Sequence, residues 1–136
     1  IGSGDMLSAE AAAHALTETG VTAVMIARGT YGNPWIFKNT QALVEGQPVL
    51  APTLDQMLAS FMMHVKLLDA ADIHIARARS LSTWYFRGIP NAAYWRGKSV
   101  RCVTAQDFID LALEIKATVK KLEGEQESSE HNLFMS

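Results

Sequence analysis

Apolar residues recur three or four positions apart through most of the second half of the chain, a spacing that predicts amphipathic helices. The two strongest stripes run from Leu54 to Leu68 and from Phe108 to Leu122, and Thr104 stands where an N-cap would start the second helix. Two shorter helices are expected between them, at about 72–87 and 91–101. The pattern therefore predicts a small helical bundle.

The first part of the chain follows a different pattern. Ser8 is a suitable N-cap for a helix over Ala9–Thr19, and the continuous apolar run Val21–Ala27 is typical of a strand buried on both faces. Pro34 then suits the first turn of a helix that is expected to end near Glu45. Helix, strand and helix joined by short connectors are typical of α/β proteins.

The length limits what this first part can be. A complete (β/α)₈ barrel needs about 250 residues, so any barrel signature in 136 residues must belong to a fragment. No apolar run is long enough to predict a membrane span, and the first residues do not resemble a signal peptide. The single cysteine fits a protein of the reducing cytoplasm. We expect a cytoplasmic protein.

The basic residues are distributed unevenly along the chain. Half of the twelve lie between Ile73 and Gln106, a segment without Asp or Glu that also holds five of the eleven aromatic residues. Cations interleaved with aromatic rings favour RNA, because they neutralise phosphates and stack on bases. A solvated basic face without a ligand is the alternative. The predicted RNA-binding residues are Arg77, Arg79, Arg87, Arg96, Lys98 and Arg101.

Other residues with reactive or aromatic side chains are expected to be structural. A lone Cys102 is usually a small packed hydrophobe, and no histidine has a second ligand at metal spacing, so neither a catalytic cysteine nor a metal site is predicted. Trp84, Tyr85 and Phe86 are consecutive on a helix and cannot all face one way. At least one of them should lie in the core.

Two glycine-containing loops near the N-terminus could together hold a phosphate. Loops of this kind follow the last strands of (β/α)₈ barrels, where backbone N–H groups approach the anion closely. Gly2-Ser3-Gly4 alone could equally be an engineered linker. Three segments, taken together, favour the phosphate site over a linker. They are Gly2-Ser3-Gly4-Asp5, Val24-Met25-Ile26-Ala27-Arg28-Gly29 and Gly32-Asn33-Pro34-Trp35-Ile36-Phe37.

These segments closely resemble the end of the barrel in tRNA-dihydrouridine synthases, flavin enzymes that reduce a uridine in tRNA. The resemblance covers residues 1 to about 122, and the Arg-Gly-x-x-Gly-Asn-Pro-Trp run is its most specific part. The later matches, which are similar to the family's C-terminal helical domain, are Arg79, Trp84-Tyr85, Gly88-Ile89-Pro90-Asn91-Ala92-Ala93 and Arg96.

The resemblance implies a role for each part of the chain. It implies a parent enzyme in which FMN takes hydride from NADPH and reduces uridine to 5,6-dihydrouridine, while the basic helical surface binds tRNA. The family's catalytic cysteine, its flavin-ring contacts and the first six strands would lie upstream of Ile1. We therefore expect this chain alone to hold no catalytic residue, to retain no FMN and to be inactive. The residues that resemble FMN-phosphate contacts are Ser3, Gly4, Asp5, Ala27 and Arg28.

The sequence departs from the family pattern in three places. Ser3 stands where Asn is commoner, Ala27 replaces the usual Gly, and Ser80-Leu81 replace a common Lys-His pair. The alternative is a stand-alone helical RNA-binding or interaction protein that retains barrel remnants. A barrel strand without neighbours could also drive homo-oligomerisation.

The expected fold is mostly α, a C-terminal βα fragment of a TIM barrel followed by a small helical bundle. Residues 1–46 are assigned to the fragment of the flavin-binding barrel and residues 53–123 to the helical tRNA-binding domain. Residues 124–136 are acidic and Ser-containing without periodicity, and are predicted to be a disordered tail.

Overall fold

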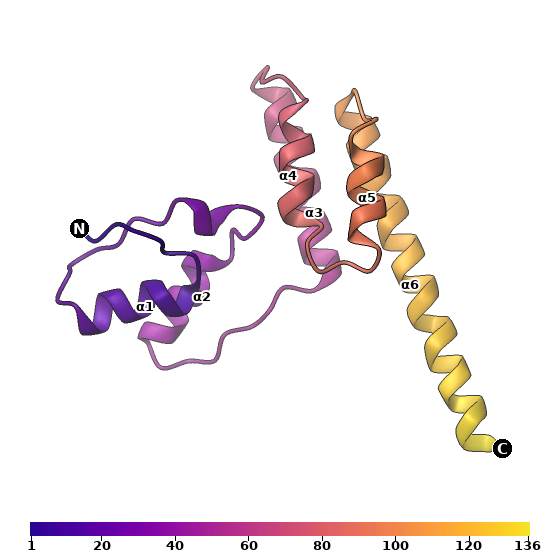
Figure 1. Cartoon of the computed structure of the whole chain (residues 1–136), viewed down its shortest axis with the longest axis horizontal. Helices are drawn as coiled ribbons and strands as arrows, with labels where there is room; N and C mark the ends of the chain where they lie inside the picture. Colours follow the sequence, from indigo (N-terminus) through magenta and orange to yellow (C-terminus); the bar gives the residue numbers. More distant parts are fainter. The chain divides into compact units, whose positions relative to one another are not determined.

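The computed structural model describes residues 1–136, and its internal contacts divide the chain into two units, Ile1–Thr53 and Leu54–Ser136. The secondary structure consists of α-helices and one short 3₁₀ helix, with no β-strand (Figure 1). The expected mostly α fold is confirmed.

The first unit is built on two helices, α1 (Ala9–Glu18) and α2 (Ile36–Val44). The Ser8 hydroxyl accepts a hydrogen bond from the Ala11 N–H at 3.1 Å, which confirms the predicted N-cap. The two helices pack together, with Ala12 and Ile36 both fully buried. Small side chains on α1 permit this close approach, so the unit has a core of alanines and few larger residues.

The predicted strand Val21–Ala27 is wrong. The segment is irregular and makes a single parallel bridge, between Val24 and Gly2, and none of its residues is buried. A parallel strand needs hydrogen-bonded neighbours and helices over both of its faces, and this unit supplies only one short neighbour. Apolar composition alone therefore does not make a strand here.

Helix α2 also begins two residues later than Pro34. The preceding residues form consecutive turns, in which the Asn33 N–H donates to the Thr30 carbonyl at 3.0 Å and the Ile36 N–H donates to the Asn33 carbonyl at 3.2 Å. These turns use the backbone groups that an earlier helix start would need. Pro34 therefore lies in the turn that leads into the helix.

The second unit is a helical bundle. Helix α3 packs against α4 and α6, and α5 packs against α4 and α6 (Figure 1). The bounds of the four helices are Leu54–Ala70 for α3, Arg77–Tyr85 for α4, Ala92–Ser99 for α5 and Ala105–Met135 for α6.

An aromatic cluster forms the centre of this bundle. Phe61 on α3 is fully buried, and its ring centroid lies 5.6 Å from that of Tyr85, 5.0 Å from that of Phe86 and 6.4 Å from that of Phe108. The apolar stripes predicted on the first and last helices do face the core, although Leu122 at the end of the second is 41% exposed. Aromatic packing thus joins α3, α4 and α6.

Helix α4 begins five residues later than the predicted start at residue 72. Asp72 has φ +54°, in the left-handed region, and the Ile73 N–H donates back to the Leu68 carbonyl at 2.9 Å. This arrangement resembles the helix-ending motifs in which a left-handed residue satisfies the last carbonyls. It ends α3 and turns the chain before α4 can start.

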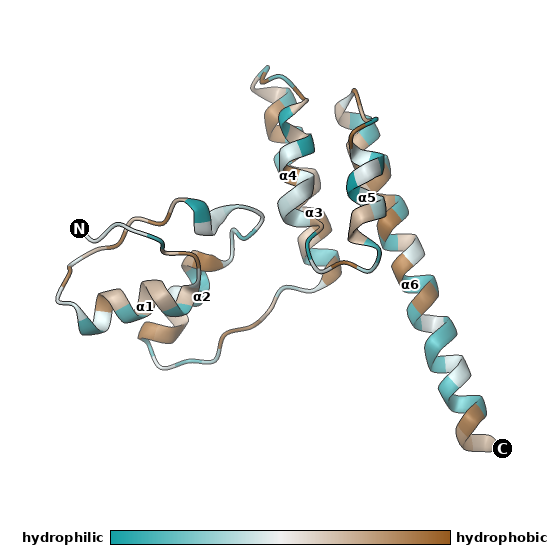
Figure 2. Cartoon of the chain, viewed as in Figure 1, coloured by the Kyte–Doolittle hydropathy of each residue, from teal (hydrophilic) through white to brown (hydrophobic).

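The predicted disordered tail is also corrected. Residues 124–135 continue helix α6 without a break, although every one of them is exposed. The segment has no proline, and extending a helix that already exists costs far less than nucleating a new one. Figure 2 shows that this part of α6 is hydrophilic except at its last turn, where Leu133, Phe134 and Met135 are exposed.

Candidate functional site

The two loops that resemble phosphate contacts lie next to each other in the first unit. The Gly2 N–H donates to the Ala23 carbonyl at 2.7 Å, and the Met25 N–H donates to the Gly2 carbonyl at 2.8 Å. The Arg28 guanidinium forms an ion pair with the Asp5 carboxylate between the same two loops. Two segments that are distant in the sequence are therefore brought together.

Gly29 allows the second loop to pack closely on the first. It is buried in the short 3₁₀ helix Arg28–Thr30, and a Cβ atom placed on it would lie 2.2 Å from the Met6 carbonyl oxygen and 2.8 Å from Ile36 Cδ1. Real side chains essentially never approach a carbonyl so closely. Only glycine therefore permits this contact between the loops.

The paired loops have free groups of the kind that a phosphate needs. The backbone N–H groups of Ser3, Gly4 and Asp5 make no hydrogen bond within the chain. A guanidinium has five N–H donors, so the ion pair with Asp5 leaves Arg28 able to bind an additional anion. Backbone N–H groups and a guanidinium are donors of the kind that phosphates accept from, while the Asp5 carboxylate reduces the positive charge beside them.

The six candidate RNA-binding residues are not equivalent. The Arg79 guanidinium points back into the bundle, where Nη2 donates to the Cys102 carbonyl at 3.0 Å and Nε donates to it at 3.4 Å. This pair of hydrogen bonds ties α4 to the loop between α5 and α6. Arg79 therefore has a structural partner that sequence alone did not reveal.

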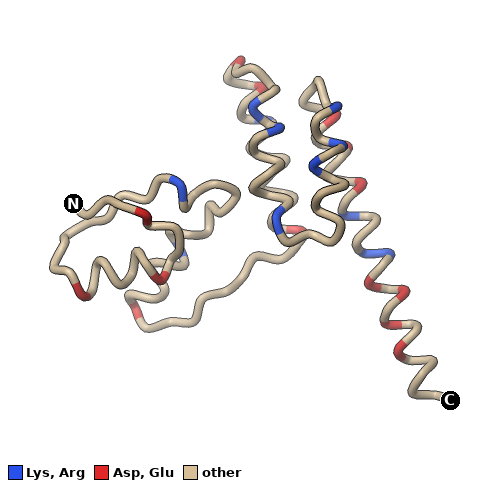
Figure 3. The backbone as a smooth tube through the Cα atoms, viewed as in Figure 1, with Lys and Arg blue, Asp and Glu red and all other residues tan.

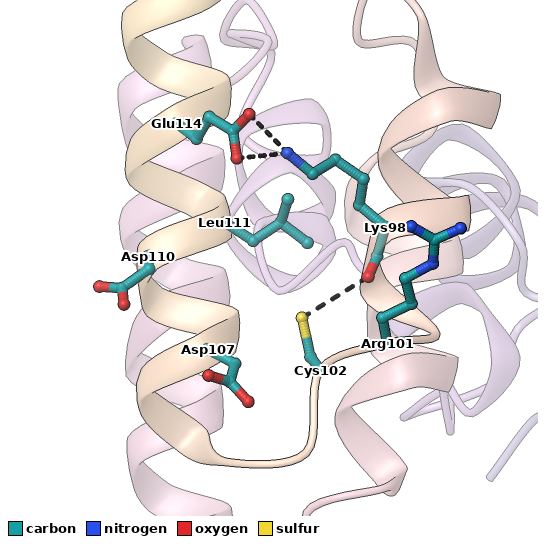
Figure 4. A pocket seen from close by; sticks show the side chains of 7 residues that line it. All are labelled: Lys98, Arg101, Cys102, Asp107, Asp110, Leu111 and Glu114. Carbon is teal, nitrogen blue, oxygen red and sulfur yellow. Dashed lines mark hydrogen bonds and ion pairs between the residues drawn. The ribbon is translucent and has the colours of Figure 1, made fainter.

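Lys98 is also engaged within the bundle. Its ammonium donates to both carboxylate oxygens of Glu114 on α6, at 2.6 and 2.7 Å, and this hydrogen bonding raises the pKa of Lys98 (Figure 4). The pair borders an open recess of about 270 Å³ between α5 and α6, which Arg101 and Cys102 also line. This volume falls below the roughly 300–1,000 Å³ of most small-molecule sites.

The remaining four cations, Arg77, Arg87, Arg96 and Arg101, have no acidic partner. Figure 3 shows cations on α4 and α5, whereas the acidic residues of this unit lie mainly along α6 and at the ends of α3. The bundle therefore retains free positive charge on the segment that carries no acidic residue.

Of the three consecutive aromatic residues, Trp84 is the one that lies outside the core. Trp84 is 37% exposed and the Arg87 guanidinium carbon lies 4.7 Å from its ring centroid, a cation–π contact. Its neighbours Tyr85 and Phe86 are buried, as is Trp95, whose indole N–H donates to the Pro90 carbonyl at 3.0 Å. The i, i+3 spacing from Trp84 to Arg87, which places both side chains on one side of a helix, is the sequence feature from which this contact could have been predicted.

The other candidate chemistries are not supported by the geometry. Cys102 is buried, burial raises the pKa of its thiol, and the thiol lies 3.8 Å from the Lys98 carbonyl oxygen. The predicted packing role of this cysteine is confirmed. No three His, Cys, Asp or Glu side chains are grouped so that they could hold a metal ion. None of the helices has the length and apolar character needed to cross a bilayer.

Comparison with known proteins identifies one family. A family model described as dihydrouridine synthase matches residues 1–122, which covers the first unit and most of the second. Residues 123–136, the exposed end of α6, lie outside that match.

Individual relatives agree with this match. The chain is 35% identical over 99 residues to tRNA-dihydrouridine synthase B of Pasteurella multocida, covering 69% of this chain and 30% of the relative. It is 32% identical over 117 residues to a probable tRNA-dihydrouridine synthase of Mycobacterium leprae, covering 83% and 30%. Over 123 residues it is 30% identical to probable tRNA-dihydrouridine synthase 1 of Synechocystis, covering 88% and 35%. The chain thus spans about a third of the length of these relatives.

Proposed function

The chain belongs to the dihydrouridine synthase family, and from this we propose that it supplies part of the FMN-phosphate contact and the tRNA-binding surface of a tRNA-dihydrouridine synthase. The observation that carries the proposal is the family match over residues 1–122, because it runs through both units. In this proposal the first unit would correspond to the end of the barrel and the second unit to the RNA-binding domain.

The reaction of the proposed parent enzyme is the reduction of uridine in tRNA to 5,6-dihydrouridine. Bound FMN would supply the hydride chemistry with NADPH as the reductant, and the protein would bind and orient the reactants. In this chain, Ser3, Gly4 and Asp5 would offer backbone N–H groups to the FMN phosphate, and Arg28 would add a charge-assisted hydrogen bond. No residue of this chain is assigned a proton-transfer step.

The phosphate loops alone are not expected to retain the cofactor. They offer contacts to one end of FMN, and the flavin ring would need contacts from outside this chain. Purified protein mixed with FMN should therefore elute from a desalting column without visible flavin absorbance. A one-to-one yellow complex would show that the chain binds the cofactor by itself. It would contradict the proposal that the flavin ring needs contacts from outside this chain.

The free cations on α5 and in the turn that follows it offer a direct test of tRNA binding. We expect the full chain to bind an unmodified tRNA transcript in a fluorescence-anisotropy titration, with affinity that falls as salt rises, because neutralising phosphates releases counterions. The double variant Arg96→Gln and Arg101→Gln should weaken binding and reduce the salt slope by about one for each phosphate that is no longer neutralised. Arg79 is unsuitable for this test, since its substitution would break the hydrogen bonds to Cys102.

A matched control separates specific contacts from net charge. Lys66→Gln with Lys121→Gln likewise removes two charges, here from exposed helical positions outside the acid-free segment. This variant should bind tRNA within about twofold of the wild type, whereas Arg96→Gln with Arg101→Gln should not. Equal losses of affinity in the two double variants would mean that the basic segment is a solvated surface that makes no specific contact with tRNA.

A further inference from the structure

One face of α4 combines free cations with an exposed aromatic ring. Arg77, Ser80, Trp84 and Arg87 follow one another at intervals of three, four and three residues, so they lie along one side of the helix, and all four are exposed. We call these four residues the α4 stripe. The ten residue steps from Arg77 to Arg87 correspond to a length of about 15 Å at the rise of an α-helix.

Arg87 belongs to this stripe although α4 ends at Tyr85. Its N–H donates to the Trp84 carbonyl at 3.4 Å, so the last helical turn is prolonged just far enough to bring the Arg87 side chain over the Trp84 ring. Ala78, Ser82 and Tyr85 face the core from the other side of the helix. Because these three side chains are packed in the core, the α4 stripe on the opposite side of the helix faces solvent.

The charge of the stripe is not neutralised within the chain. Neither Arg77 nor Arg87 forms an ion pair, and Asp69 and Asp72 at the end of α3 form none either. The cation–aromatic contacts of Lys98 with Tyr94 and Trp95 differ in this respect. Lys98 lies 5.6 Å from the Tyr94 ring centroid, but both oxygens of the Glu114 carboxylate accept from its ammonium.

We propose that the α4 stripe binds an unpaired RNA nucleotide, whose base stacks on the Trp84–Arg87 pair while Arg77 and Arg87 contact the flanking phosphates. The inference rests on the proposed function, that the helical unit binds tRNA, and adds where and how a base is held. Aromatic rings and guanidinium planes are the usual stacking surfaces for bases splayed out of folded RNA. A paired base inside a duplex cannot reach such a surface, so the occupant is a loop or bulge nucleotide.

The exposure of Trp84 distinguishes it from a core aromatic residue. Trp95 is 3% exposed. Trp84 is 37% exposed and carries a guanidinium without an acidic partner on its ring. Both Trp84 and Arg87 are exposed, so a base can reach this pair without repacking of the core.

Substitution of Trp84 in the full chain tests the stacking contact. In anisotropy titrations with an unmodified tRNA transcript, Trp84→Ala should weaken binding by about 5- to 150-fold, the range found for loss of one base–aromatic stack. Its salt slope should stay that of the wild type because no charge is removed, whereas Arg87→Gln should lower the slope by about one. Trp84→Phe keeps an aromatic face and should bind within about threefold of the wild type.

Two further measurements keep the proposal falsifiable if Trp84→Ala folds poorly. Single-stranded oligouridine should quench the tryptophan fluorescence of the wild type, and Trp84→Phe should abolish that quenching while retaining affinity. A duplex RNA of equal length should quench much less. Tyr94→Ala is the matched control, because Tyr94 is exposed beside a neutralised cation, and it should bind RNA as the wild type does.

The outcomes separate this inference from the function on which it rests. Wild-type protein that binds no tRNA would overturn both. Wild-type protein that binds tRNA in a salt-dependent way, with Trp84→Ala unchanged, would overturn the α4 stripe alone. Persistent quenching in Trp84→Phe, or equal losses of affinity in Tyr94→Ala and Trp84→Ala, would also overturn it.

Discussion

At the scale of single residues, Gly29 shows how one backbone position holds the proposed phosphate loops together. A Cβ atom at this position would lie 2.2 Å from the Met6 carbonyl oxygen, and neither backbone segment can move without disturbing the other. We expect Gly29→Ala to destabilise the first unit by about 1–3 kcal/mol, the usual cost of overpacking. Faster amide hydrogen exchange in α1 and α2 would report this destabilisation directly.

The control for Gly29 is Gly97, which lies within α5 with no atom near its missing side chain. Gly97→Ala should stabilise the second unit by up to about 1 kcal/mol, because alanine is the better helix former. Amide exchange in α1 that is the same in Gly29→Ala and in the wild type would mean that the loops do not touch as described.

Asp107 gives a prediction for pH at the same scale. Its carboxylate accepts hydrogen bonds from the Val103 and Thr104 N–H groups, both at 2.9 Å, and these bonds lower the pKa of Asp107. A carboxyl whose pKa is lower in the folded state stabilises the fold above its unfolded pKa of about 4, and this stabilisation disappears as pH falls through the folded value. The melting temperature of the wild type should therefore be higher than that of Asp107→Asn at pH 7, and the difference between the two melting temperatures should be smaller near pH 3.

The matching control alters the uncharged half of the same cap. The Thr104 hydroxyl accepts from the Asp107 N–H at 3.1 Å, so Thr104→Ala should cost about 1 kcal/mol at pH 7. The Thr104 side chain is the smallest contributor to the lowered pKa of Asp107, so this cost should change less toward pH 3 than the cost of Asp107→Asn. A melting difference between wild type and Asp107→Asn that stays constant from pH 7 to pH 3 would contradict the predicted role of the charge.

At the scale of helices, the bundle depends on the contact between α3 and α6. Phe61 is fully buried and Leu111 is 4% exposed, so Phe61→Ala and Leu111→Ala should each destabilise the second unit by about 2–5 kcal/mol. Leu113 lies on the same helix as Leu111 but is 50% exposed, and Leu113→Ala should change the melting temperature little. Thermal melts that rank Leu113→Ala with the other two would show that the helix faces are misassigned.

The helices also show what sequence reasoning could supply. Periodicity identified the buried faces of α3 and α6, because the residues that form the buried face of an amphipathic helix recur at regular intervals along that same helix. It failed for Val21–Ala27, because whether an apolar run becomes a strand depends on partners that lie elsewhere. It failed again at the end of α6, where helical continuation needed no buried face at all.

The candidate site, like the helices, could be predicted from the sequence only in part. The pairing of the two loops followed from the family resemblance, and the structure brings Asp5 and Arg28 together. The roles of individual cations did not follow, because a charge pattern contains no distances. Only the folded bundle shows that Arg79 and Lys98 have internal partners while Arg77 and Arg87 have no acidic one.

At the scale of the whole molecule, the two units differ in the apolar side chains that they bury. The second unit has a large aromatic core, whereas the first buries mostly alanines, and both units leave some larger apolar side chains in solvent. Its backbone around residues 21–27 also has few hydrogen-bond partners. Exposed apolar patches with open backbone groups favour association. The exposed apolar residues of the first unit include Leu7, Met25, Tyr31, Phe37 and Val44.

We therefore expect this protein to self-associate through its first unit, and two methionines allow a matched test. Met25 in the first unit and Met63 on α3 are both 58% exposed, so replacing either with lysine adds the same charge at the same exposure. Light scattering at tens of micromolar should show Met25→Lys shifted toward monomer, because a charge within the irregular segment opposes the burial of that segment between copies. Met63→Lys should scatter as the wild type does. A monomeric wild type would mean that the first unit tolerates its exposed apolar surface in water, and equal shifts in both variants would place the contact elsewhere.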